Sequence, residues 1–428
     1  MFKEIKEAVN WMVSQRNKEI GYTSLKKYLD EQGNHLDKLK VIHVAGTNGK
    51  GSTTAMLMSC LKEAGYRVGT FTSPHLLTHE DRIRINNVQI PEDDFLRICN
   101  DRKALWEKYH LSMFEMDLDL ASIWFCENQV DVVIIEAGIG GLHDSTNVIQ
   151  KTLASVIVSI GFDHMDRLGD TLEKIAFEKA GIIKDNGLVI CGEKKTECLK
   201  VIQQQAKLHH AQMHLPQSVE MLSVHPIRFK MYDLEVELSE LALYQVHNAG
   251  CALETLIQLR NRNCLKITNN QIVNGLKKAH WAGRFDVVAE NPVTICDGAH
   301  NAHGMEALKQ SVQILKRPLI CVFACLKDKD KLEMIETLKS FSDELILTEF
   351  DFYRALKVDD LPCDVLKIKD WKNAIDTARY KAQEGTVLIT GSLYFISEVM
   401  AYFKLQEKVN SYRDSSSDYV VPVSENSH

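Results

Sequence analysis

The chain has 428 residues, 45% of them hydrophobic and 25% charged, a globular composition that is too long for one ordinary core. With 51 basic and 58 acidic residues, its net charge of −7 predicts no nucleic-acid partner and no membrane association, so an acidic substrate needs local positive groups. The 11 cysteines form no C-x-x-C pair, and neither a signal peptide nor a membrane span is evident. We therefore expect reduced thiols and a cytoplasmic protein.

Along the first two thirds of the chain, apolar strands alternate with helices. A helix at 52–64 is ended by Gly65, and strands are expected at 41–44, 69–72, 131–136 and 154–160. Near-continuous apolar strands separated by helices indicate a mostly parallel sheet covered on both faces. Residues 226–238 instead alternate about a Tyr-Asp turn, which predicts an antiparallel hairpin, and helices follow at 245–260 and 269–279.

A second alternation predicts a smaller α/β domain, with strands at 293–297, 319–323, 344–347 and 387–390. We expect one domain over 1–290 and another over 293–407, joined by a hinge at 290–292. The weak periodicity after residue 408 predicts a mobile tail at 408–428.

The stretch 45–53 reads Ala-Gly-Thr-Asn-Gly-Lys-Gly-Ser-Thr and lies between a strand and a helix. Backbone amides and a helix N-terminus converge on an anion in such a loop, Lys50 would neutralise phosphate, and Ser52 or Thr53 would face magnesium. A standard P-loop places the hydroxyl residue directly after the lysine, whereas here Gly51 intervenes. The alternative is a glycine turn that Ser52 caps.

The sequence of this loop resembles the corresponding motif of the Mur ligase superfamily. Later sequence blocks resemble those of its folylpolyglutamate synthase and dihydrofolate synthase branch. The blocks that carry the resemblance are Thr-Ser-Pro-His-Leu at 72–76, Glu-Ala-Gly-Ile-Gly-Gly at 136–141, Asp-Ser-Thr-Asn at 144–147, Asp-His at 163–164, Glu-Lys-Ala-Gly-Ile-Ile-Lys at 178–184, Trp-Ala-Gly-Arg at 281–284, Asp-Gly-Ala-His-Asn at 297–301 and Thr-Gly-Ser-Leu-Tyr at 390–394. The resemblance implies a P-loop-type domain, similar to the Mur ligase central domain, followed by a smaller Rossmann-like domain.

The resemblance also implies roles for individual residues. Lys50, His164 and Lys179 are the expected catalytic residues. The expected ATP contacts are Gly46, Thr47, Asn48, Gly49, Lys50, Gly51, Ser52, Thr53, Asn248, Arg284, Asp297 and His300. The expected ligands of two Mg²⁺ ions are Ser52, Ser73, Glu136 and His164, and the expected substrate contacts are Thr72, Pro74, Arg82, Phe114, Asp144 and Ser145.

The residues themselves support part of this assignment. Glu136 and His164 both follow buried strands, at the sheet edge where open α/β folds bind ligands. The structural alternatives are a paired buried glutamate, an ordinary structural histidine and, for Arg284, a surface ion pair. Gln245 and Asn248 are three residues apart on a helix, so they share one face.

Lys179 lies in a predicted helix at 172–180, where most lysines are solvated. In the family that the chain resembles, the corresponding lysine is carboxylated by CO₂, so we expect a carbamate at Lys179. That chemistry requires a neutral amine, which burial beside other cations would favour.

Several positions depart from the family pattern. His79-Glu80-Asp81-Arg82 stands where members commonly show F-N-E-R, and Leu142 replaces a frequent arginine or glycine. Ala282 and Ala302 replace frequent prolines. The first departures lie around the expected pterin and glutamate pockets.

The resemblance implies a monomeric ligase that joins L-glutamate to a folate, and also to dihydropteroate, through an acyl phosphate while ATP is cleaved to ADP and phosphate. One alternative is a Mur-type ligase of another carboxylate and amino acid, such as a cell-wall precursor ligase. Such ligases usually carry an additional N-terminal domain, for which the position of the loop at Gly46 leaves no room. The other alternative is a non-catalytic ATP-binding homologue.

Overall fold

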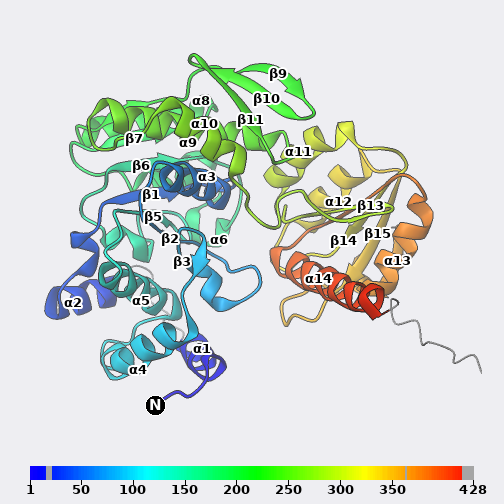
Figure 1. The fold of residues 1–428 in the computed structure, drawn as a ribbon, viewed down its shortest axis with the longest axis horizontal. Coiled ribbons are helices and arrows are strands. Elements are labelled where there is room, and N and C mark those ends of the chain that lie inside the picture. Colours follow the sequence, from blue (N-terminus) through cyan, green and yellow to red (C-terminus); the bar gives the residue numbers. More distant parts are fainter. Residues whose placement is uncertain (16–21, 362–363, 417–428) are drawn as a thin grey trace, which may run out of the picture. The chain divides into compact units, whose positions relative to one another are not determined.

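A computed structural model describes residues 1–15, 22–361 and 364–416. The chain forms two compact α/β units, the first comprising Met1–Ala282 and Asn301–Gln313 and the second Gly283–His300 and Ile314–His428. Figure 1 shows the helices and strands of each unit. Within the described ranges, none of the helices has the length and apolar character that crossing a bilayer requires.

The first unit is built on an eight-stranded sheet with the order β4-β3-β2-β5-β1-β6-β7-β8. All strands from β2 to β8 in this order run parallel, whereas β3 and β4 form an antiparallel edge. Their bounds are β1 Val41–Ala45, β2 Val68–Phe71, β3 Ile83–Ile85, β4 Val88–Gln89, β5 Val132–Glu136, β6 Ala154–Ile157, β7 Leu188–Cys191 and β8 Gln212–His214. The expected parallel sheet is thereby confirmed.

Alternate residues of the strands pack against different helices, as the two-residue period of a strand requires. Ile42 and Ile134 face a core shared with α3, α9 and α10, whereas Val133 and Ile135 face α4 and α5. The helices of this unit are α1 Ile5–Ser14, α2 Thr23–Gln32, α3 Lys50–Glu63, α4 Glu92–Lys108, α5 Met113–Glu127, α6 Met165–Leu168, α7 Leu172–Ala180, α8 Thr196–Leu208, α9 Tyr244–Asn261, α10 Asn269–Lys278 and α11 Ala302–Ser311, with short 3₁₀ turns η1 His35–Lys38, η2 His79–Arg82, η3 Ser145–Val148 and η4 Val312–Ile314.

A small antiparallel sheet completes the first unit. Its strands are β9 Glu220–Val224, β10 Ile227–Met231 and β11 Leu234–Leu238, and β10 pairs with β11 from Ile227↔Leu238 to Met231↔Leu234. The hairpin expected at 226–238 is therefore confirmed. Phe229 and Val236 join the core beneath α9, so the hairpin covers that helix rather than extending the main sheet.

The second unit has a six-stranded sheet with the order β12-β13-β17-β14-β15-β16, antiparallel only between β12 and β13. Its elements are β12 Asp286–Glu290, β13 Val293–Asp297, β14 Leu319–Phe323, α12 Lys331–Lys339, β15 Glu344–Glu349, η5 Val358–Asp360, β16 Leu366–Asp370, α13 Trp371–Ala382, β17 Thr386–Thr390 and α14 Leu393–Ser416. All four strands expected here are present.

The expected domain limits differ from the observed ones in two places. Residues 290–292, the expected hinge, form the turn of the β12–β13 hairpin, because Glu290 pairs with Val293 inside one sheet. The first unit therefore ends at Ala282, although α11 returns to it. In the expected tail, α14 continues to Ser416, so residues 408–416 are helical, and residues 417–428 lie outside the described part of the chain.

Candidate active site

The loop at 46–49 leaves the carboxyl end of β1 and is held by the segment that follows β6. The Thr47 backbone N–H donates to the Ser159 carbonyl at 2.7 Å, and the Thr47 hydroxyl donates to the Gly161 carbonyl at 3.0 Å. Asn48 N–H donates to the Ser159 hydroxyl at 3.2 Å. These hydrogen bonds fix the loop against the segment that follows β6.

Two glycines of the loop are required by their neighbours. Gly49 has φ +84°, in the left-handed region, and a Cβ at this residue would lie 2.2 Å from Oδ1 of Asn248. A Cβ at Gly51 would lie 2.5 Å from the indole Nε1 of Trp281. The glycine that separates Lys50 from Ser52 thus makes room for a tryptophan. The loop has the strand–loop–helix arrangement in which an anion can bind, and its contact with phosphate stays a prediction.

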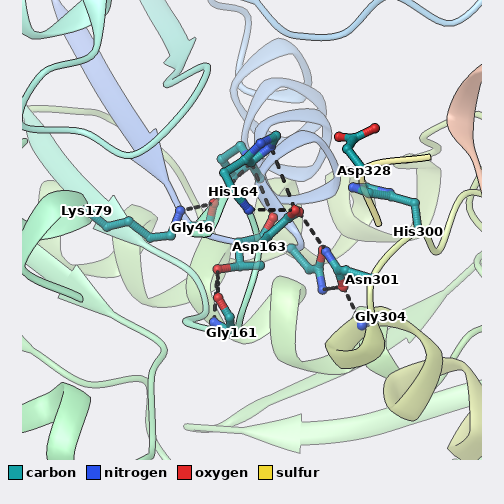
Figure 2. A network of polar contacts seen from close by, with 12 residues as sticks. Gly46, Gly161, Asp163, His164, Lys179, His300, Asn301, Gly304 and Asp328 are labelled. Atoms are coloured by element: carbon teal, nitrogen blue, oxygen red, sulfur yellow. Dashed lines mark hydrogen bonds and ion pairs between the residues drawn. The ribbon is translucent and has the colours of Figure 1, made fainter. Parts of the chain in front are cut away.

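Two lysines converge on one backbone carbonyl of this loop. Lys50 Nζ donates to the Gly46 carbonyl at 3.1 Å. Lys179 Nζ, from α7, donates to the same carbonyl at 3.0 Å, as Figure 2 shows. Lys179 is only 4% exposed, so it is not a solvated helix lysine. Burial, and then the nearby charge of Lys50, lower the pKa of Lys179 to about 7.

Oxygen atoms suited to a hard cation lie next to these lysines. Glu136, at the end of β5, has Oε1 at 3.8 Å from Lys50 Nζ, and its Oε2 accepts from the Ser73 N–H at 3.4 Å. The hydroxyls of Ser52 and Thr53 are buried and have no hydrogen-bond partner. Unpaired buried hydroxyls are costly, so their lone pairs fit a ligand that the loop receives, such as Mg²⁺ or phosphate.

His164 lies on the same edge of the sheet but is held differently. Its backbone is left-handed at φ +49°, it is the N-cap residue directly before α6, and its Nε2 is 3.9 Å from Oδ1 of Asp163. The structure thus brings Ser73 together with Glu136, while His164 is associated with Asp163.

Asn301 connects Asn48 of the loop to Asp163, and sequence reasoning assigned it no role. Its side-chain amide lies 3.0 Å and 3.2 Å from atoms of the Asn48 amide, and its Nδ2 donates to Asp163 Oδ2 at 3.0 Å (Figure 2). Its Oδ1 also caps α11 by accepting from Gly304 N–H at 2.7 Å. The sequence signals were its place at the end of the 297–301 block and at a helix start, and an asparagine at a helix start is ordinarily read as a cap.

The expected substrate contacts lie on several short segments around the site. Arg82 is buried, and its carbonyl accepts from Thr72 N–H at 2.9 Å, which closes the 72–82 segment at its base. Pro74 is exposed at the outer part of this segment. Phe114 packs on Phe71 with ring centroids 5.3 Å apart.

Asp144 is buried and accepts hydrogen bonds from neighbouring residues, and Ser145 beside it is half-buried. Its Oδ2 accepts from Ile139 N–H at 2.8 Å, and its Oδ1 accepts from the Thr146 hydroxyl, which also contacts His43 Nε2 at 2.8 Å. Burial raises the pKa of Asp144, and these hydrogen bonds oppose the rise. The structure therefore shows Asp144 shaping the glycine-rich loop after β5, and its expected contact with substrate stays a prediction.

Arg284, Asp297 and His300 belong to the second unit. Arg284 Nη1 donates to the Gly283 carbonyl at 2.9 Å, Asp297 Oδ1 accepts from the Ala299 N–H at 2.8 Å, and His300 Nδ1 is 2.8 Å from the Gly298 carbonyl. All three lie at or near the carboxyl end of β13. Their contact with ATP stays a prediction. In the first unit, Asn248 donates to Gln245 Oε1 at 2.8 Å, as their shared helix face predicts.

Comparison with known proteins identifies the family. The Mur ligase middle domain matches residues 44–256, and the Mur ligase glutamate ligase domain matches residues 283–393. The dihydrofolate synthase/folylpolyglutamate synthase of Bacillus subtilis is 35% identical over 94% of this chain and 100% of its own length, and the Escherichia coli enzyme is 33% identical over 84% and 86%.

Solved structures agree with the sequence comparison. Escherichia coli FolC in complex with DHPP and ADP is 29% identical, with a TM-score of 0.84 over 95% of this chain and 99% of that one. A bifunctional folylpolyglutamate synthase/dihydrofolate synthase with Mn, AMPPNP and L-glutamate bound is 27% identical, with a TM-score of 0.84 over 94% and 98%. Since the similarity extends over both units and the full length of a curated relative, the chain belongs to the folylpolyglutamate synthase/dihydrofolate synthase family of Mur ligases.

Proposed function

We propose that this protein joins L-glutamate to a folate while ATP is cleaved to ADP and phosphate, and that it also accepts dihydropteroate. The observation that carries the proposal is the pair of lysine side chains that meet at the Gly46 carbonyl, beside Glu136 and the unpaired hydroxyl of Ser52. The names of the relatives and the ligands in their structures, which are ADP, DHPP, AMPPNP and L-glutamate, support the same reaction.

The loop and its lysines would bind the nucleotide phosphates. Lys50 now donates to the carbonyls of Gly46 and Thr47, the latter at 3.4 Å, and these weak contacts can be exchanged for phosphate oxygens. The N-terminus of α3 directs its free N–H groups to the same place. Both features stabilise the negative charge that accumulates during phosphoryl transfer.

The site also fits divalent cations. One ion would be held by Glu136, Ser73 and the unpaired hydroxyl of Ser52. The second ion would be held by His164. Bound there, two Mg²⁺ ions would supply positive charge to the phosphate oxygens.

The reaction itself would proceed in two steps. The substrate carboxylate attacks the γ-phosphorus of ATP, giving an acyl phosphate and ADP. The glutamate amine then attacks the acyl carbon, and phosphate leaves as the amide bond forms. Lys50 stabilises the charge on the transferred phosphoryl group in the first step and on the leaving phosphate in the second.

We further propose that Lys179 carries a carbamate. A buried amine with a pKa of about 7 is neutral in about half of the molecules near neutral pH, and a neutral amine can add to CO₂. The amine lone pair forms a new N–C bond to CO₂, one C=O π pair moves onto oxygen, and the nitrogen releases one proton to solvent, so that the neutral amine becomes a carboxylate anion. The carbamate would then compensate the charge of Lys50, which otherwise lies beside a second lysine.

A rescue experiment tests the carbamate. We expect Lys179→Ala to lose most ligase activity while still binding ATP, and acetate to restore part of that activity by placing a carboxylate in the space. Lys184→Ala is the matched control, because Lys184 is another largely buried lysine, with a pKa lowered to about 8, but it contacts Asn147 Oδ1 at 2.7 Å instead of the loop. Acetate should not rescue Lys184→Ala. Full activity of Lys179→Ala without acetate would contradict the proposal.

We also propose that the protein acts as a monomer in the cytoplasm, where ATP and reduced folates are available, and that Arg284, Asp297 and His300 of the second unit contact ATP. Light scattering coupled to gel filtration measures the mass in solution. A stable dimer would contradict the first statement, and an unchanged KM for ATP in Arg284→Ala would contradict the last.

A phosphate-release assay with a panel of acceptors tests the reaction. Release should require ATP, Mg²⁺, L-glutamate and either dihydropteroate or a reduced folate. Release with a different amino acid and carboxylate would identify another Mur-type ligase. No release with any pair, in protein that binds ATP, would indicate a non-catalytic homologue.

A further inference from the structure

The segment at 72–82 contains the departure from F-N-E-R and adjoins the active site. Ser73 at its start donates to Glu136, and Asp81 near its end accepts from the N–H groups of Leu77 and Thr78 at 2.8 Å and 3.1 Å. The outer part of the segment, including Pro74 and Leu77, is exposed. The segment is therefore a closed loop with an exposed outer part and polar anchors beneath it.

One carboxylate from a different element anchors this loop. Asp117 of α5 is 0% exposed. Its Oδ1 lies 2.7 Å from His79 Nε2, and its Oδ2 lies 3.7 Å from Arg82 Nε. Arg82 Nε also donates to His75 Nδ1 at 3.3 Å, so Asp117 acts directly or indirectly on three side chains of the loop.

The hydrogen bonds of His79 and Asp117 indicate where protons and charge lie in this cluster. His79 Nδ1 is buried without a partner, which suits a ring that carries its proton on Nε2 and donates it to Asp117. Asp117 Oδ2 accepts no hydrogen bond, so its remaining interaction is the ion pair with Arg82. Removing the carboxylate would leave the Arg82 guanidinium buried without this counter-ion.

The same helix also presents a residue expected to contact substrate. Phe114 lies one turn before Asp117 in α5, and a Cβ added at Gly138 would lie 2.9 Å from the Phe114 ring. Since α5 holds Phe114 and anchors the loop, it can set the position of both relative to the substrate.

We propose that Asp117 is a positioning residue for the folate or pteroate substrate: it holds the 72–82 loop, through His79 and Arg82, in the conformation that receives this carboxylate. The inference rests on the proposed function. It also gives a reason for His79 at the position where family members commonly have phenylalanine, because His79 and Asp117 form one buried pair.

The test compares Michaelis constants for the two substrates. We expect Asp117→Asn to raise the KM for the folate roughly 10- to 100-fold, the range typical of a misplaced binding group, while the KM for ATP stays unchanged. Asp119→Asn is the matched control, since Asp119 is also buried on α5 but accepts from Tyr28 and Trp106, at 2.7 Å and 2.8 Å, and not from the loop. It should leave both Michaelis constants unchanged.

Two further variants separate positioning from packing. His79→Phe removes one of the two contacts through which Asp117 holds the loop and keeps the Asp117–Arg82 ion pair, so its KM for the folate should rise less than in Asp117→Asn. His79→Phe/Asp117→Leu replaces the pair with apolar groups that can pack, yet its KM for the folate should rise as in Asp117→Asn. Wild-type Michaelis constants in Asp117→Asn or in the double variant would overturn the inference. Equal rises in the KM for ATP and for the folate would also overturn it.

A second readout does not require turnover. Amide hydrogen exchange should become faster in residues 72–82 of Asp117→Asn and should stay unchanged there in Asp119→Asn. If the wild type shows no ligation, the proposed function fails, and this exchange result still decides whether Asp117 holds the loop. Unchanged exchange in Asp117→Asn would refute that role.

Discussion

Replacing Gly51 tests the explanation of the unusual phosphate loop. Gly51→Ala adds a Cβ that would lie 2.5 Å, 2.7 Å and 3.0 Å from Nε1, Cε2 and Cζ2 of Trp281. The main chain of Trp281 is held, because its backbone N–H donates to Glu240 Oε1 at 3.0 Å, and the Arg84 guanidinium lies 5.7 Å from the centroid of its indole ring. Gly51→Ser, which would place a hydroxyl residue directly after Lys50 as in a standard P-loop, meets the same obstacle.

The expected magnitude follows from two opposing terms. Replacing a helical glycine by alanine gains about 0.5–1 kcal/mol, whereas overpacking costs about 1–3 kcal/mol. The free energy of unfolding of Gly51→Ala should therefore be about 1 kcal/mol lower than that of the wild type, which lowers the Tm by roughly 2–4 °C for a domain of this size. In a Trp281→Ala background the clash is absent, so the same change should become stabilising.

A double-mutant cycle measures this coupling. Urea denaturation of the wild type, the two single variants and the double variant should give a coupling free energy of about 1–3 kcal/mol between positions 51 and 281. Because Lys50 and Ser52 flank the added methyl group, the KM for ATP should rise in Gly51→Ala and partly recover in the double variant. Additive free energies, with Gly51→Ala stabilising in both backgrounds, would refute the reasoning.

Three further predictions follow from the site. Lys50→Ala should reduce kcat by about 10²–10³ without unfolding the protein, because a preorganised phosphate-neutralising charge is lost; near-normal turnover would contradict this. ATP and the carboxylate substrate, without glutamate, should give positional exchange of the bridging oxygen in ATP and a hydroxylamine-trapped acyl group, whereas exchange only with glutamate present would favour another order of events. In CO₂-free buffer, where Lys179 is a free amine, burial lowers its pKa from 10.5 to about 7, so the unfolded chain binds the extra proton between these values and the wild type gains stability as pH rises through this window. Lys179→Met should therefore be more stable than the wild type near pH 7, by a margin that shrinks toward about pH 10; a margin independent of pH in urea denaturation would contradict this.

The local features of the fold were predictable from the sequence. The strand before Gly46 and the helix after it follow from a run of apolar residues and from glycine placement, and both signals are local. The burial of Lys179 also had a local signal, since Ile175, Ala176 and Ala180 are buried on the same side of α7.

The features that sequence reasoning missed depend on contacts between distant segments. Asn301 meets Asn48 across 253 positions, and Gly51 needs its space because of Trp281. Nothing in the pattern around Asp117 indicated that it would pair with His79 rather than face solvent. The expected hinge at 290–292 failed for a similar reason: Asp286–Glu290 reads as an ordinary linker until its pairing with β13 is known.

The most direct test of the account is the product itself. Purified protein is incubated with ATP, Mg²⁺, a reduced folate and L-glutamate, and the folate is analysed by mass spectrometry while ADP is quantified in the same sample. The account predicts a folate extended by one or more glutamyl residues, with one ADP formed per residue added, and a rate of product formation about 10²–10³ lower in Lys50→Ala. ADP formation without any extended folate or dihydropteroate product, from protein that binds both substrates, would contradict it.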